Sequence, residues 1–184
     1  MSRVGEVLIS EEEISAKVRE LGARISRDYQ GKDLLMVGIL KGAFVFLADL
    51  VRAVTLPLRL DFLGVASYGK KTVSSEEVKV FKDLNEPVAG RNVLIVEDII
   101  DSGITTDYLM RLLAVRSPAS VKICALLDKP DRRKVTAPLD YWGFQIADRF
   151  VVGYGLDAAE RYRNLPAIHL LELDDEDRLT EKGV

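Results

Sequence analysis

The sequence predicts an α/β fold in which a mainly parallel, twisted sheet is flanked by helices. Short, continuous apolar runs recur along the chain, and such runs are typical of parallel strands buried on both faces. Segments with helical spacing stand between them, so strand and helix alternate. The chain of 184 residues is 48% hydrophobic and 30% charged, which is the size and composition of one globular domain.

The first helix is predicted to begin near Glu11. Ser10 and Glu13 have the spacing of a capping box, in which each side chain bonds the other residue's backbone N–H. Apolar residues then recur at helical spacing. They are Ile14, Val18, Leu21 and Ile25.

Two strands and a helix are expected next. DLLMVGIL (33–40) is a continuous apolar run and predicts a buried parallel strand, and KGAFVFLADLVRAV (41–54) predicts the helix after it. LRLDFLGVAS (58–67) alternates apolar and charged residues, with Leu58, Leu60 and Phe62 against Arg59 and Asp61. This alternation predicts a half-exposed strand.

Residues 68–79 are rich in charged and hydroxyl side chains, which predicts a long exposed loop or a flexible hairpin. Loops of this length are uncommon unless they act as lids. NVLIVE (92–97) and SVKICALL (120–127) are expected as buried strands, and TDYLMRLLAVR (106–116) as the helix between them. The acidic residues 172–184 are expected to be a solvated end.

Composition argues against several classes of protein. The net charge of −3 gives no general attraction to nucleic acid, and no apolar run reaches the length of a membrane span. Cys124 is the one cysteine and His169 the one histidine, and both lie in apolar runs. A disulfide framework and a Ser-His-Asp or Cys-His nucleophile are therefore not expected. The protein is expected to lie in the reducing cytoplasm.

A candidate site follows the strand at 92–97. Ligands of parallel sheets bind beyond the carboxyl ends of the strands, where residues 97–106 are expected to lie. Gly103 allows close approach of backbone, and Ser102, Thr105 and Thr106 place hydroxyl and amide donors at a helix start, which suits a phosphate. Glu97 and Asp98 suit a diol or a metal. A phosphate beside a diol describes a ribose 5-phosphate.

VLIVEDIIDSGITT (93–106) resembles the phosphoribosyl pyrophosphate motif of the type I phosphoribosyltransferases. The resemblance implies that family's fold with a small hood built from the chain ends. It implies one domain over 1–184, with a mobile lid at about 66–80 and a hood that includes about 148–184. The implied ribose and 5-phosphate residues are Glu97, Asp98, Asp101, Ser102, Gly103, Ile104, Thr105 and Thr106.

Further segments resemble the hypoxanthine-guanine phosphoribosyltransferases. GILKGAFVFLADL (38–50) is similar to their first loop, which implies that Lys41 and Gly42 bind pyrophosphate and that the Leu40–Lys41 peptide is cis. ASYGKKTVSS (66–75) resembles their mobile loop, so Ser67 and Tyr68 are implied to cover the substrates.

The purine residues come from two more segments. LLDKP (126–130) places Lys129 where the family bonds the purine 6-oxo group; an ammonium only donates, which disfavours the amine of adenine. DRFVVGYGLDAAERYRNL (148–165) is similar to the family's carboxy-terminal motif. There Phe150 stacks on the purine and Val151 contacts its edge through the backbone. Arg149 departs from the family's usual lysine, which leaves its contact open.

The resemblance also implies the reaction. A 6-oxopurine joins C1 of the sugar through N9, and pyrophosphate leaves with the help of Mg²⁺. Asp157 is implied to hold the metal, with Glu97 and Asp98 as further candidates, and Arg163 to bind pyrophosphate. Asp101 is implied to act as general base or acid at N7. A homodimer or homotetramer is implied.

Alternative functions remain at this stage. The same fold could transfer the sugar to xanthine, or, less in keeping with Lys129, to adenine or a pyrimidine. A regulator that senses phosphoribosyl pyrophosphate and binds nucleic acid is the alternative outside enzymes. Such a regulator should carry a basic stripe, and here the net charge is negative.

Overall fold

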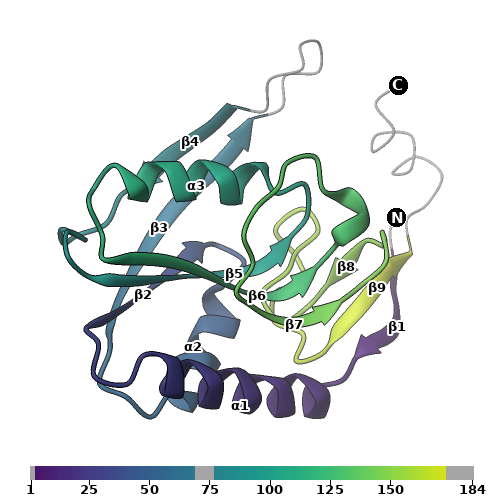
Figure 1. Ribbon diagram of the computed structural model, residues 1–184. Coiled ribbons are helices and arrows are strands. Elements are labelled where there is room, and N and C mark those ends of the chain that lie inside the picture. Colours follow the sequence, from purple (N-terminus) through teal and green to yellow (C-terminus); the bar gives the residue numbers. More distant parts are fainter. Residues whose placement is uncertain (1–2, 69–76, 173–184) are drawn as a thin grey trace.

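The computed structural model describes residues 3–68 and 77–172, and its centre is a six-stranded sheet with the order β4-β3-β2-β5-β6-β7 (Figure 1). β4 pairs antiparallel with β3, and the other neighbours are parallel. The predicted, mainly parallel sheet is confirmed. Its strands are β2 (Leu34–Leu40), β3 (Arg59–Tyr68), β4 (Glu77–Lys82), β5 (Asn92–Ile100), β6 (Ser120–Asp128) and β7 (Tyr141–Gln145).

Helices cover both faces of this sheet. α1 (Glu11–Asp28) and α2 (Phe44–Ala53) pack on one face, and α3 (Ile104–Ala114) packs on the other (Figure 1). α1 begins at Glu11 as expected: the Ser10 N–H donates to Glu13 Oε2 at 2.8 Å, and the Glu13 N–H donates to Ser10 Oγ at 3.2 Å. The four apolar residues predicted for its inner face are buried.

A second, three-stranded sheet forms the predicted hood. Its order is β1-β9-β8, with β1 (Arg3–Ile9), β8 (Val151–Val152) and β9 (Ile168–Glu172) all antiparallel. Segments from opposite ends of the chain thus lie side by side, next to the β5, β6 and β7 part of the large sheet (Figure 1). His169 lies within the hood, where its Nδ1 is 3.3 Å from the Gly5 carbonyl oxygen.

Several element ends differ from the prediction. β5 continues to Ile100, so Glu97 and Asp98 end a strand and do not belong to a loop. β3 and β4 extend into the expected lid, because Ser67 pairs with Val78 and Tyr68 with Glu77. Residues 69–76 of that lid lie outside the described residues, as does most of the acidic tail.

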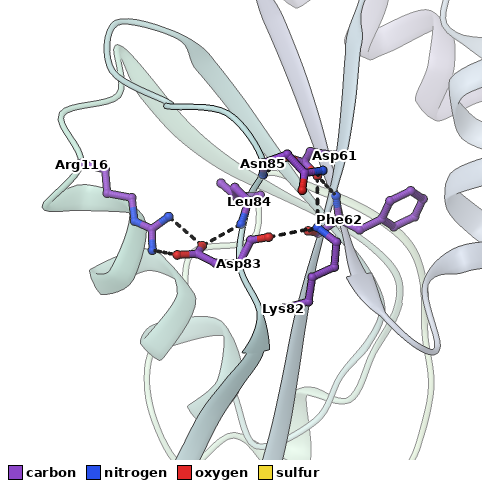
Figure 2. Close-up of polar contacts among 7 residues, drawn as sticks. All are labelled: Asp61, Phe62, Lys82, Asp83, Leu84, Asn85 and Arg116. Carbon is purple, nitrogen blue, oxygen red and sulfur yellow. Dashed lines mark hydrogen bonds and ion pairs between the residues drawn. The ribbon is translucent and has the colours of Figure 1, made fainter.

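Two residues of β3 depart from the predicted alternation, whereas Arg59 is exposed and Phe62 packs against the core as expected. Leu60 is 46% exposed, whereas Asp61 is only 6% exposed. The Asp61 carboxylate accepts from the N–H of Phe62 at 2.7 Å and the N–H of Asn85 at 2.6 Å, and from Asn85 Nδ2 at 2.9 Å (Figure 2). Lys82 Nζ lies 3.4 Å away. These donors satisfy the buried charge of Asp61, which the alternating pattern alone did not indicate.

The same network reaches α3. Asp83 forms a two-pronged ion pair with Arg116, in which both N–O distances are 2.8 Å (Figure 2). Lys82 Nζ also donates to the carbonyl oxygens of Phe62 at 2.8 Å and Asp83 at 3.0 Å. The base of the β3–β4 hairpin is thereby fastened to the carboxyl end of α3.

Candidate active site

A cleft of about 1150 Å³ opens between the carboxyl ends of the central strands and the hood. Parallel sheets usually bind ligands at this edge. Six of the predicted site residues line it: Asp98, Asp101, Lys129, Phe150, Val151 and Asp157. Side chains from four separate segments therefore converge on one cavity.

The predicted phosphate seat is the turn between β5 and α3. Gly103 caps α3 with a φ of 82°, in the left-handed region that favours glycine. The Ile104 N–H donates to Ser102 Oγ at 3.4 Å. Thr106 is 2% exposed, so it is buried in the first turn of the helix. The amino end of a helix with free backbone donors is suited to an anion.

Two carboxyl groups sit just before this turn in a strongly desolvated position. Burial raises the pKa of Glu97 well above its usual value, and the nearby Asp98 raises it further. Burial likewise raises the pKa of Asp98 to about 6. Glu97 Oε1 is buried and has no hydrogen-bond partner among the described residues. Both groups would gain from a ligand that donates hydrogen bonds or carries positive charge.

The first loop approaches Asp98 so closely that only glycine fits. A Cβ on Gly42 would lie 1.7 Å from Asp98 Oδ2. A Cβ on Gly155 would lie 2.2 Å from the Gly42 carbonyl oxygen, and Gly155 has a φ of 99°. The Leu40–Lys41 peptide is cis, as expected. The first loop is thus held between β5 and the segment that follows β8.

Charged side chains of these two loops form a connected group. Arg163 Nη2 is 2.8 Å from Asp157 Oδ1, and Arg163 Nη1 donates to the Gly155 carbonyl oxygen at 2.8 Å. Lys41 Nζ is 2.9 Å from Glu160 Oε2. The Glu160 N–H donates to Asp157 Oδ2 at 2.8 Å. Both predicted pyrophosphate cations therefore face carboxylates that an anionic ligand could replace.

Glu160 is a residue of this group that the sequence reading missed. Lys41 holds the pKa of its carboxyl below the usual value, first through a hydrogen bond. Lys41 and Glu160 are 119 positions apart, so no local pattern pointed to the pair.

The predicted purine residues Lys129, Phe150 and Val151 also line the cleft. Lys129 is 7% exposed. Its backbone N–H donates to the Ile100 carbonyl oxygen at 3.0 Å, which ties the residue to the end of β5. Phe150 is 38% exposed and Val151 is 5% exposed. Arg149 also lines the cleft. The side chains of Ser67 and Tyr68, predicted to cover the substrates, lie outside the described residues.

Magnesium was predicted with Asp157, Glu97 and Asp98 as ligand candidates. Within residues 3–68 and 77–172, no three His, Cys, Asp or Glu side chains are grouped closely enough to enclose a metal. Mg²⁺ commonly binds one or two carboxylates and completes its shell with substrate oxygens and water. Asp157, which lines the cleft, fits that mode.

The fold and the cleft are those of an α/β protein with a ligand site at the carboxyl ends of its parallel strands. A family model described as "Phosphoribosyl transferase domain" matches residues 8–159. The chain belongs to this phosphoribosyltransferase family, and its activity is that of a transferase. The type I fold predicted from the sequence is confirmed.

Relatives agree over nearly the whole chain. Hypoxanthine-guanine phosphoribosyltransferase of Bacillus subtilis is 54% identical over 92% of this chain and 94% of its own. Hypoxanthine phosphoribosyltransferase of Salmonella typhimurium is 48% identical over 96% of this chain and 100% of its own. A crystal structure of a hypoxanthine phosphoribosyltransferase from Staphylococcus aureus superposes with a TM-score of 0.88, at 47% identity and 92% coverage of both chains.

None of the helices within the described residues is long and apolar enough to cross a membrane.

Proposed function

We propose that the chain is a purine salvage enzyme that transfers the 5-phosphoribosyl group from phosphoribosyl pyrophosphate to N9 of hypoxanthine or guanine. The products are IMP or GMP and pyrophosphate. The observation that carries the choice of base is Lys129, which lies in the cleft with Phe150 and is 7% exposed. Lysine only donates, so it pairs with a 6-oxo group and leaves the amine of adenine without an acceptor.

The proposed reaction forms the bond from N9 to C1 and breaks the bond from C1 to the pyrophosphate oxygen. Its transition state resembles an oxocarbenium ion, so catalysis depends on positioning and on stabilising charge. Glu97 and Asp98 accept from the ribose hydroxyls, and the turn at 102–106 holds the 5-phosphate. Lys41 and Arg163 exchange their carboxylate partners for pyrophosphate.

Asp101 is the proposed general base that takes the proton from N7 as N9 attacks. It lines the cleft with Lys129, as this role requires. General acid–base catalysis typically contributes about 10²- to 10⁴-fold. Asp101→Asn should therefore lower kcat far more than the affinity for phosphoribosyl pyrophosphate. Equal losses in kcat and in affinity would count against the role.

Mg²⁺ is proposed as the cofactor, held by Asp157 together with pyrophosphate oxygens. When bound, it would neutralise charge on the leaving group. Chelation with EDTA should abolish turnover, and added Mg²⁺ should restore it.

A homodimer or homotetramer is proposed, supported by Phe44, which is 45% exposed at the start of α2 beside the first loop. Light scattering would give the state. We also propose a cytoplasmic location, which suits the buried free thiol of Cys124, and one domain over 1–184 with a lid at 66–80.

The test is a magnesium-dependent assay that follows nucleotide formation from phosphoribosyl pyrophosphate with hypoxanthine, guanine, xanthine and adenine. Turnover of hypoxanthine or guanine, with none of adenine, is expected. Xanthine as the preferred base would change the substrate but not the reaction. Preferred turnover of adenine would refute the part assigned to Lys129.

A further inference from the structure

Residues 132–135 form a strap that lies against the turn between β5 and α3, which is called the phosphate turn below. The Lys134 and Val135 N–H groups donate to the Ser102 carbonyl oxygen at 2.9 and 3.3 Å. Arg133 Nη1 donates to the Asp101 carbonyl oxygen at 3.0 Å, and the same guanidinium pairs with Asp128. Asp128 is 5% exposed at the end of β6, so this anchor is buried. The strap thereby fixes the backbone of the turn.

Arg132, within the strap, holds the side chain of Asp101. Arg132 Nε is 2.8 Å from Asp101 Oδ1, and Arg132 Nη1 is 3.1 Å from Asp148 Oδ1. Asp101 Oδ1 is shielded from solvent and meets Arg132 as an ion pair, with no hydrogen-bond partner among the described residues, although the side chain as a whole is 41% exposed. Oδ2 is thus the oxygen left to meet a ligand. The planar guanidinium spans the two carboxylates, as a single ammonium would not.

We infer that Arg132 is a positioning residue. Its ion pair with Asp101 turns Asp101 Oδ2 toward N7 of the purine, and its ion pair with Asp148 fixes the position of the Arg132 guanidinium. The inference rests on the proposed function and deepens it, because it assigns the orientation of the general base to a residue outside the phosphate turn. An error of about 1 Å in the placement of a reacting group can cost about 10²-fold in rate.

If Arg132 were purely structural, its removal would lower the unfolding temperature of the protein. The Arg132 side chain is 48% exposed, and exposed ion pairs contribute little to stability. Arg132→Gln should therefore leave the unfolding temperature unchanged while it lowers turnover. Arg111→Gln is the matched control, because Arg111 forms an exposed ion pair with Asp107 on α3 and does not line the cleft.

The experiment measures kcat and KM for phosphoribosyl pyrophosphate at saturating hypoxanthine in wild type and variants. Arg132→Gln is expected to lower kcat by about 10- to 100-fold with little change in the donor KM, and Arg132→Lys to recover part of the loss. Arg111→Gln should match wild type. In an Asp101→Asn background the Arg132→Gln effect should nearly vanish, because the two residues act as one unit.

Three outcomes overturn the inference. The first is an unchanged kcat in Arg132→Gln. The second is a loss that is equally large in the Asp101→Asn background, and the third is a loss confined to the donor KM. Each of these leaves the proposed function standing as long as wild type turns over hypoxanthine. A wild type inactive on every base would refute the proposed function and the inference together.

Discussion

Asp98→Asn should stabilise the protein above pH 6, although it should weaken binding of the sugar. Burial raises the pKa of Asp98 from 3.8 to about 6, so ionising it in the folded state costs free energy. The shift of about 2.2 units corresponds to about 3 kcal/mol at most. The near-isosteric asparagine carries no such charge at any pH.

The dependence on pH identifies the cause. Below pH 3.8 the carboxyl is protonated in both states, and the wild type bears no penalty. Between pH 3.8 and 6 the unfolded chain loses its proton first, so wild-type stability falls as the pH rises. Of the total cost of about 3 kcal/mol, about 1.4 kcal/mol of wild-type stability should be lost as the pH rises from 5 to 8. Urea unfolding of wild type and variant at both pH values measures this difference.

The reasoning is refuted if Asp98→Asn is less stable than wild type at pH 8, or if its advantage is the same at pH 5. Asp61→Asn serves as the counterpart of opposite sign. Burial raises the pKa of Asp61, but the N–H donors of Asn85 and Phe62, with Lys82, bring it below the usual value. Its carboxylate stabilises the fold above the unfolded pKa, so Asp61→Asn should destabilise at pH 7, by about 1–3 kcal/mol.

Four further predictions follow from the cleft. Donor binding should weaken as the pH falls through 6, because protonated Asp98 accepts less well; isothermal titration at pH 5 and pH 8 measures this. Gly42→Ala puts a Cβ 1.7 Å from Asp98 Oδ2, so kcat/KM for the donor should fall roughly 10- to 100-fold in steady-state assays. Gly103→Ala meets the Val135 oxygen at 2.9 Å and keeps a φ of 82°, so urea unfolding should show a loss of about 1–2 kcal/mol. Lys129→Met should lower kcat/KM for hypoxanthine about 10- to 100-fold while donor affinity, measured by calorimetry, stays constant.

The sequence predicted features that depend on local chemistry. The capping box at Ser10 and Glu13, the buried runs of β2, β5 and β6 and the order of strand and helix follow from near neighbours along the chain. The phosphate turn was found for the same reason, because its residues are contiguous. Resemblance supplied the rest of the candidate site.

Features that depend on distant partners were missed. Asp61 is buried because Asn85, which is 24 positions away, supplies donors to its carboxylate, and alternation of apolar residues carries no sign of that. Arg132 contacts Asp101 across 31 positions, from a short helical turn that had no predicted pattern. The end of β5 was placed too early because acidic residues usually signal a loop, whereas backbone pairing with β6 continues to Ile100.

The contact between Gly42 and Gly155 limits how this enzyme can be redesigned. The first loop, which contains Gly42, and the segment after β8, which contains Gly155, meet there through backbone, with no side chain between them to absorb a change in shape. A segment around 150–165 grafted from a relative to alter base preference would therefore have to bring its own first loop. Libraries that vary both segments jointly, with both glycines kept, should yield more folded variants than libraries that vary either segment alone.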